Sequence, residues 1–167
     1  MFAFYMKDVF DFTASNFAWI LVSMALVMAL IQGGAMRHLA ARYGERRLLL
    51  TGLVLMCASM GLIPNASTVA VLMIPLLASA VGRAIAQPPM MAWVSNLADE
   101  RDRGSVMGTF QSAASAARVI GPLIAGLAYQ VSPSWPFRIA SGFLVCAIAT
   151  ALVLKASEPT DTSAEPF

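Results

Sequence analysis

Two arginines lie inside long apolar stretches of this chain, where a charged side chain is costly unless another group stabilises it. Arg83 shares one face of its expected helix with Ser79 and Gln87, because the three residues are spaced i, i+4 and i+8. A second polar face has the spacing i, i+4 and i+7 and consists of Gln111, Ser115 and Arg118. Two faces that each carry a guanidinium and an amide are typical of the wall of a polar cavity.

The chemistry open to these side chains is the binding of an anion, because a guanidinium stays charged and donates hydrogen bonds in a planar fork. No Asp or Glu lies within the apolar stretches that hold Arg83 and Arg118. We therefore expect the counter-charge to be a carboxylate outside this chain or an anionic group of a bound molecule. Two alternatives stay open: each arginine pairs structurally with a carboxylate or a helix end, or it snorkels to the edge of its apolar surroundings.

Five apolar stretches must position these residues, and they fill most of the 167-residue chain. Hydrophobic residues make up 59% of it and charged residues 12%, whereas soluble proteins contain about 25% charged residues. A helix crosses a bilayer in roughly 20 apolar residues and satisfies its own backbone in lipid. The short alternating strands of a membrane β-barrel are not apparent. The predicted spans are residues 17–33, 48–64, 68–97, 106–131 and 136–154.

The predicted fold class is an all-α integral membrane protein, with a transmembrane helical bundle over residues 1–157. Residues 158–167 are polar and contain proline, and we expect a disordered cytoplasmic tail there. Basic residues of short loops face the cytoplasm, and here they follow the first, third and fifth spans: Arg37, Arg42, Arg46, Arg47, Arg101, Arg103 and Lys155. The loops 64–67 and 132–135 carry no charge. This pattern predicts an outside N-terminus and a cytoplasmic C-terminus in a plasma (bacterial inner) membrane.

The sequence contains no pattern that favours catalysis. Cys57 and Cys146 both fall inside spans, where we expect buried thiols rather than a disulfide. The single histidine, His38, has no metal-ligand spacing with either cysteine. No Ser/His/Asp set and no Gly-rich phosphate loop is present. We therefore predict that the protein is not an enzyme, and that it uses no cofactor, metal or nucleic acid.

Helix-breaking residues predict a bend in the fourth span. Proline removes a backbone donor and kinks a helix, and Gly121, Pro122 and Gly126 lie close together in that span. Two interpretations of this bend stay open: it opens or closes one side of a cavity, or it is a static kink that only serves packing. Pro75 and the pair at 88–89 raise the same question for the third span.

Small residues at intervals of four predict where helices approach one another closely. Gly82 and Ala86 have this spacing in the third span, and Gly108, Ser112 and Ala116 have it in the fourth. The chain is also rich in methionine, with 11 residues. Methionine suits a permissive binding pocket, a core gap or a lipid-facing surface, and all three interpretations stay open.

The loop after the first span resembles the short basic loop of the major facilitator superfamily, whose pattern is Gly-x-x-x-Asp-Arg-x-Gly-x-Arg-Arg. The matching residues are Arg42, Gly44, Arg46 and Arg47, whereas Arg37 and Ala41 replace the leading glycine and the acidic residue. A generic basic loop is the alternative. Residues 86–97, 99–108 and 120–126 then follow in the order of the family's helices ten and eleven, and Gly-Pro-x-x-x-Gly resembles drug-efflux and tetracycline-resistance-type members.

This resemblance implies that the five spans correspond to helices eight to twelve, an incomplete C-terminal half of a twelve-helix major facilitator fold. Residues before about Thr13 would then end helix seven. The implied function is secondary active transport by alternating access, with export of small molecules by a proton-driven antiporter. The substrate-pathway candidates are Arg83, Gln87, Gln111, Ser115 and Arg118. The alternative is a truncated, non-transporting helix bundle that acts as an interaction module.

The resemblance also implies partners: membrane lipids, a small-molecule substrate and the missing N-terminal half of the transporter. Mixed charges follow the third span, and we expect a gate-side cluster of Asp99, Arg101, Asp102 and Arg103. A solvated loop is the competing interpretation, since exposed ion pairs contribute only about 0–1 kcal/mol each.

Overall fold

The computed structural model describes residues 5–6, 8, 13–96 and 98–153. This part of the chain is helical, and it contains five helices long and apolar enough to cross a membrane. The predicted tail at 158–167 and the Lys155 position lie outside the described residues. The elements are α2 (Ala14–Leu30), η1 (Ile31–Ala35), α3 (Met36–Tyr43), α4 (Glu45–Leu62), η2 (Ile63–Asn65), α5 (Val69–Asn96), α6 (Arg103–Val131) and α7 (Trp135–Val153).

The first helix extends further than the sequence predicts. The expected basic loop is largely helix α3, which continues from α2 through one π-helical stretch, η1. Gly33 and Gly34 fall within η1, so they widen the helix without ending it. The chain reverses only at Gly44, which has φ 76° and ψ 150°. Alanine, leucine, methionine and arginine favour helix, and only glycine adopts this backbone region without strain, so the turn falls there.

Helices α4 and α5 form the centre of the bundle, and their backbones approach each other closely where the two helices cross. A Cβ atom added at Gly52 would lie 2.6 Å from the carbonyl oxygen of Gly82 and 2.8 Å from the Cβ of Ala86. The prediction of close contact at Gly82 and Ala86 is therefore confirmed. Small side chains there allow dispersion contacts between the two backbones.

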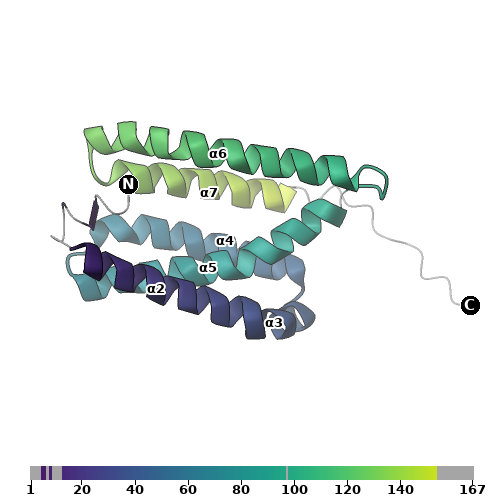
Figure 1. Ribbon diagram of the computed structural model, residues 1–167, viewed down its shortest axis with the longest axis horizontal. Coiled ribbons are helices and arrows are strands. Elements are labelled where there is room, and N and C mark those ends of the chain that lie inside the picture. Colours follow the sequence, from purple (N-terminus) through teal and green to yellow (C-terminus); the bar gives the residue numbers. More distant parts are fainter. Residues whose placement is uncertain (1–4, 7, 9–12, 97, 154–167) are drawn as a thin grey trace, which may run out of the picture.

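The remaining helices lie on both sides of this central pair (Figure 1). Helix α2 packs on α5, α7 packs on α4, and α6 lies beside α7 and α5. None of the residues of α6 is buried. Gly108 has no atom within 4 Å of its would-be Cβ, and Ser112 and Ala116 are exposed, so this predicted stripe is not buried against another of the described helices.

The α4–α7 contact contains a reciprocal polar pair. The Ser141 hydroxyl donates to the carbonyl oxygen of Cys57 at 3.4 Å, and the Cys57 thiol donates to the carbonyl oxygen of Ser141 at 3.7 Å. Both cysteines are free thiols, as expected. The expectation that both are buried is wrong: Cys57, which contacts α7, is half-buried, and Cys146 is exposed.

The apolar core lies toward the end of the bundle that holds the uncharged turns. Tyr5 packs edge-on against Phe137 with ring centroids 4.9 Å apart, and its hydroxyl donates to the Ile63 carbonyl at 3.5 Å. The Tyr129 hydroxyl donates to a carboxylate oxygen of Asp8 at 2.6 Å. Tyr5 and Asp8 thus connect η2, α6 and α7.

Candidate functional site

A cavity of about 310 Å³ lies between α5 and α6, with α4 behind it. Its polar lining comes from Arg83 and Gln87 of α5 and from Gln111 and Arg118 of α6. The helical period places each set on one side of its own helix, and the packing of α5 beside α6 brings the two sides to the same cavity. Four of the five substrate-pathway candidates thus meet at one cavity, and all four side chains are exposed to it.

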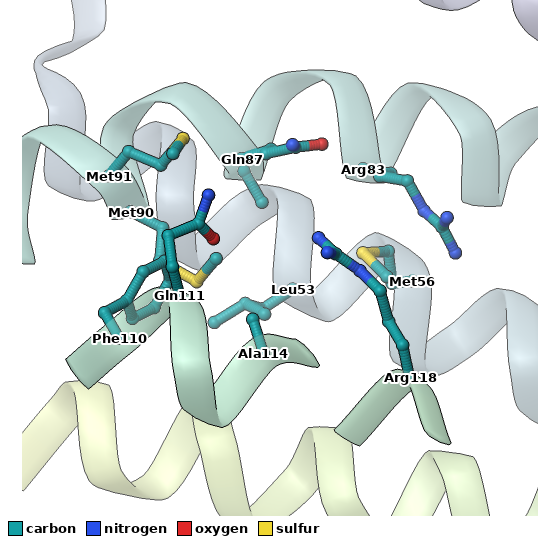
Figure 2. A pocket seen from close by; sticks show the side chains of 11 residues that line it. Leu53, Met56, Arg83, Gln87, Met90, Met91, Phe110, Gln111, Ala114 and Arg118 are labelled. Atoms are coloured by element: carbon teal, nitrogen blue, oxygen red, sulfur yellow. The ribbon is translucent and has the colours of Figure 1, made fainter. Parts of the chain in front are cut away.

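Figure 2 shows how these side chains lie. Arg118 extends from α6 toward Met56, and the Gln111 amide extends from α6 toward α5. Arg83 projects from α5 on the same side of the cavity as Met56. The guanidinium groups are therefore the charged groups of this cavity, and the amides add hydrogen-bond donors and acceptors.

The rest of the lining is apolar. It consists mainly of Leu53, Met56, Met90, Met91 and Phe110. Met56, Met90 and Met91 line the cavity, whereas Met60 and Met73 pack against the core. A role of the methionines in a permissive binding pocket stays a prediction. The contribution of α4 was not predicted. Leu53 carries no chemical signal in the sequence, and its neighbour Gly52 lies where α5 approaches α4 closely.

Two polar residues of the predicted stripes lie away from the cavity. Ser115 is exposed on α6 but does not line it. Ser79 is buried, and its hydroxyl donates to the Leu76 carbonyl at 2.7 Å. Ser115 lies between Gln111 and Arg118 in the sequence, so helical spacing alone does not decide which residues of a stripe reach the cavity.

Within the described part of the chain, neither Arg83 nor Arg118 forms an ion pair or donates a hydrogen bond within the usual distance limits. Helices α5 and α6 contain no Asp or Glu. The acidic residue of α4, Glu45, is at its first position, one end of the helix. The cavity therefore holds positive charge without a carboxylate from the helices that line it.

The predicted gate-side residues Asp99, Arg101, Asp102 and Arg103 are exposed at the α5–α6 turn. Among the described residues no ion pair joins them. The Arg103 Nε donates to the Ser95 carbonyl at 3.3 Å, which ties the start of α6 to the end of α5. The backbone N–H groups of Asp102 and Arg103 also donate to the Asp99 carbonyl, at 3.0 and 2.9 Å. A gating role of this turn stays a prediction.

The predicted bend residues Gly121, Pro122 and Gly126 lie inside the continuous helix α6. Gly121 has no atom within 4 Å of its would-be Cβ, so no neighbouring helix demands a glycine there. It lines a separate apolar hollow of about 170 Å³ against α7, together with Pro136 and Phe143. A role in opening the cavity stays a prediction.

The basic motif residues lie around the turn between α3 and α4. Gly44 makes the turn, and the Arg42 guanidinium lies 5.8 Å from the centre of the Tyr43 ring. The Arg46 Nε is buried without a hydrogen-bond partner in the described residues. Arg47 lines an apolar hollow of about 570 Å³ with Leu39 and Ile85, among others.

Comparison with known sequences assigns the family. A sequence model of the Major Facilitator Superfamily matches residues 1–167, the whole chain. The chain belongs to this superfamily of membrane transporters. It is also 25% identical over 156 residues to a protein of Bacillus subtilis (strain 168) named Multidrug resistance protein 1. The match covers 93% of this chain and 40% of that relative, so the chain spans well under half of the relative's length.

Membership of the Major Facilitator Superfamily confirms the resemblance inferred from the basic loop and the Gly-Pro-x-x-x-Gly helix. The all-helical structure with five potential spans agrees with an integral membrane protein of this superfamily. Members of this superfamily are transporters rather than enzymes.

Proposed function

We propose that this chain contributes helices eight to twelve of a secondary active exporter of small amphipathic molecules. The observation that carries the proposal is the cavity between α5 and α6, because it joins four polar side chains to a flexible apolar lining in a superfamily of transporters. The relative from Bacillus subtilis is named for multidrug resistance, which supports an amphipathic substrate and export as its direction.

In this proposal the cavity is one wall of a substrate site that alternates in access. Transporters of this architecture place the substrate between two halves that rock against each other. The closely packed α4–α5 pair supplies a rigid element, and α6, without buried residues, supplies the exposed wall. The proposed partner is the N-terminal set of transporter helices, which would cover that wall.

A proton antiporter also needs a titratable group inside the membrane. Helices α5 and α6 contain no Asp, Glu or His, and His38 lies in α3 near the end of the bundle, with its Nδ1 3.3 Å from the Gly34 carbonyl. We therefore place the proton-carrying group of the proposed antiporter on the partner helices.

In this proposal the protein lies in the plasma membrane, and its C-terminus faces the cytoplasm. The turn at Gly44 and the turn before α6 lie at one end of the bundle, and the uncharged turns lie at the other (Figure 1). The basic residues Arg42, Arg46 and Arg47 thus gather at a single end, which favours that end as cytoplasmic.

The test is an efflux assay in membranes that compares this chain alone with the chain joined to the seven N-terminal helices of a homologue. Two dyes are tested, the amphipathic cation ethidium and the amphipathic anion fluorescein, because export of either one tests the transport function. The fused homologue of natural sequence is the positive control. We expect export from the joined form and none from the chain alone.

Export by the chain alone would show that five helices make a complete pathway and would contradict the proposed need for partner helices. No export from a joined form that is well folded and inserted would contradict the transport function. That second result would favour the non-transporting helix bundle as the correct interpretation.

A further inference from the structure

The cavity between α5 and α6 presents two cations to one space and supplies no anion of its own. Arg83 and Arg118 both line it, and α4, α5 and α6 contribute no carboxylate to its lining. A guanidinium does not lose its proton at accessible pH. At membrane depth its charge is unfavourable unless an anion or water accompanies it. The pair thus forms a site of positive potential that a negative group would stabilise.

The shape of the cavity restricts what that negative group belongs to. A volume of about 310 Å³ is at the small end of ligand pockets. Phe110, Met90 and Met91 give one part of the wall an apolar, adaptable surface. Gln87 and Gln111 add amide groups beside the arginines, which donate hydrogen bonds to oxygen acceptors.

We propose that this cavity selects amphipathic anions, with a carboxylate, sulfonate or phosphate head between Arg83 and Arg118 and an apolar body against Phe110, Met90 and Met91. The inference rests on the proposed function, because it names the charge class of the molecule that occupies the proposed substrate site. It differs from a general drug pocket in one respect: an amphipathic cation of the same size is rejected by the two guanidinium groups.

Two sources supply such an anion: a free small molecule and the headgroup of an anionic lipid. Their shared chemistry is an oxyanion on an apolar chain. The source is distinguished by placing the protein in nanodiscs of phosphatidylcholine alone and then in nanodiscs that include phosphatidylglycerol. Weaker binding of a free anion in the second set indicates that the lipid occupies the cavity, and unchanged binding indicates a free ligand; both results agree with an anion site.

The test uses the full chain in phosphatidylcholine nanodiscs and two fluorescent probes of matched length. Dansylaminohexanoic acid is the anion and dansylcadaverine is the cation, and empty nanodiscs give the background for each. We expect saturable binding of the anion above background and no such binding of the cation. Anion binding should weaken as salt increases, because the attraction is between charges.

Variants assign the binding to the two arginines. We expect Arg83→Gln and Arg118→Gln each to weaken anion binding by about tenfold or more, and the double variant to abolish it. Arg→Lys at either position should retain part of the affinity, since lysine keeps the charge but loses the planar fork. Arg138→Gln is the matched control, because Arg138 is exposed on α7 and does not line the cavity. Circular dichroism checks that each variant keeps its helices.

Equal binding of both probes, or unchanged anion binding by the double variant, would overturn the inference. Assays on the joined transporter distinguish a failure of the anion-site inference from a failure of the proposed transport function. Ethidium export that survives the double variant retains the transport function and rejects anion selection. Anion binding by the chain without any export from the joined form retains the anion site and rejects transport.

Discussion

The α4–α5 crossing and the free face of α6 carry similar small residues but have opposite environments. At the crossing, Gly52 and Gly82 bring two backbones so close that an added Cβ on Gly52 would lie 2.6 Å from a carbonyl oxygen. On α6, an added Cβ on Gly108 would meet nothing within 4 Å. The difference teaches that a small residue permits close contact but does not create it. The contact also needs a partner helix with its own small residues opposite.

The comparison predicts its largest effect at the crossing. We expect Gly52→Ala to destabilise the bundle by about 2–3 kcal/mol, the upper part of the range for overpacking, because backbone and the Ala86 Cβ cannot both move away. Unfolding of the purified protein in mixed micelles of increasing sodium dodecyl sulfate, followed by circular dichroism, measures the change.

Gly108→Ala is the matched control, since it makes the same substitution inside a helix with open space around it. It should leave stability unchanged or raise it by up to about 1 kcal/mol, because alanine favours helix over glycine. Equal destabilisation by both variants would show that the α4–α5 contact is not what constrains glycine.

A second effect is expected at Gly44, where glycine is required by the backbone conformation and not by a close neighbour. Gly44 also has open space around its would-be Cβ, but its φ is 76°. We expect Gly44→Ala to cost about 1–2 kcal/mol, because alanine is strained in this region. The same unfolding measurement tests this, with Gly104→Ala as a glycine in open space without a positive φ. No difference between the two variants would mean that the turn adopts another backbone conformation.

A smaller effect is expected at the α4–α7 contact, which is held by polar atoms instead of by glycine backbones. Ser141→Ala removes the donor to the Cys57 carbonyl and should cost about 0.6 kcal/mol, a common value for one hydrogen bond between membrane helices. Ser23→Ala is the control, because the Ser23 hydroxyl donates to Trp19 within its own helix at 2.8 Å. A larger loss at Ser23 would argue against an interhelical role for Ser141.

The smallest perturbation is chemical labelling of the natural thiols. Cys146 is exposed, whereas Cys57 is half-buried and its thiol donates to Ser141. N-ethylmaleimide added to the protein in detergent should therefore label Cys146 first, with little change in stability. The Cys57→Ala and Cys146→Ala variants assign each labelled site by mass spectrometry. Faster labelling of Cys57 would show that α7 does not stay packed on α4.

Much of the candidate site was predictable because it follows from helical period and charge. Arg83 with Gln87 and Gln111 with Arg118 each lie within seven residues of one another, so the helix alone places each pair on one face. The positions of Ser79 and Ser115 were not predictable in this way, because each depends on how its helix meets a neighbour. The basic loop was mispredicted for a related reason: short helices such as α3 share their composition with polar loops.

The sequence by itself determined the membrane-spanning helical class, the superfamily and the absence of acidic residues from α5 and α6, since these depend on composition, order and local spacing. Only the tertiary structure decided that the two polar faces meet at one cavity, that Leu53 and Met56 form its back wall, and that one small-residue stripe is packed while the other is open. Those features depend on which helices become neighbours, and lipid, which is as apolar as the helices themselves, leaves that choice to the fit between surfaces.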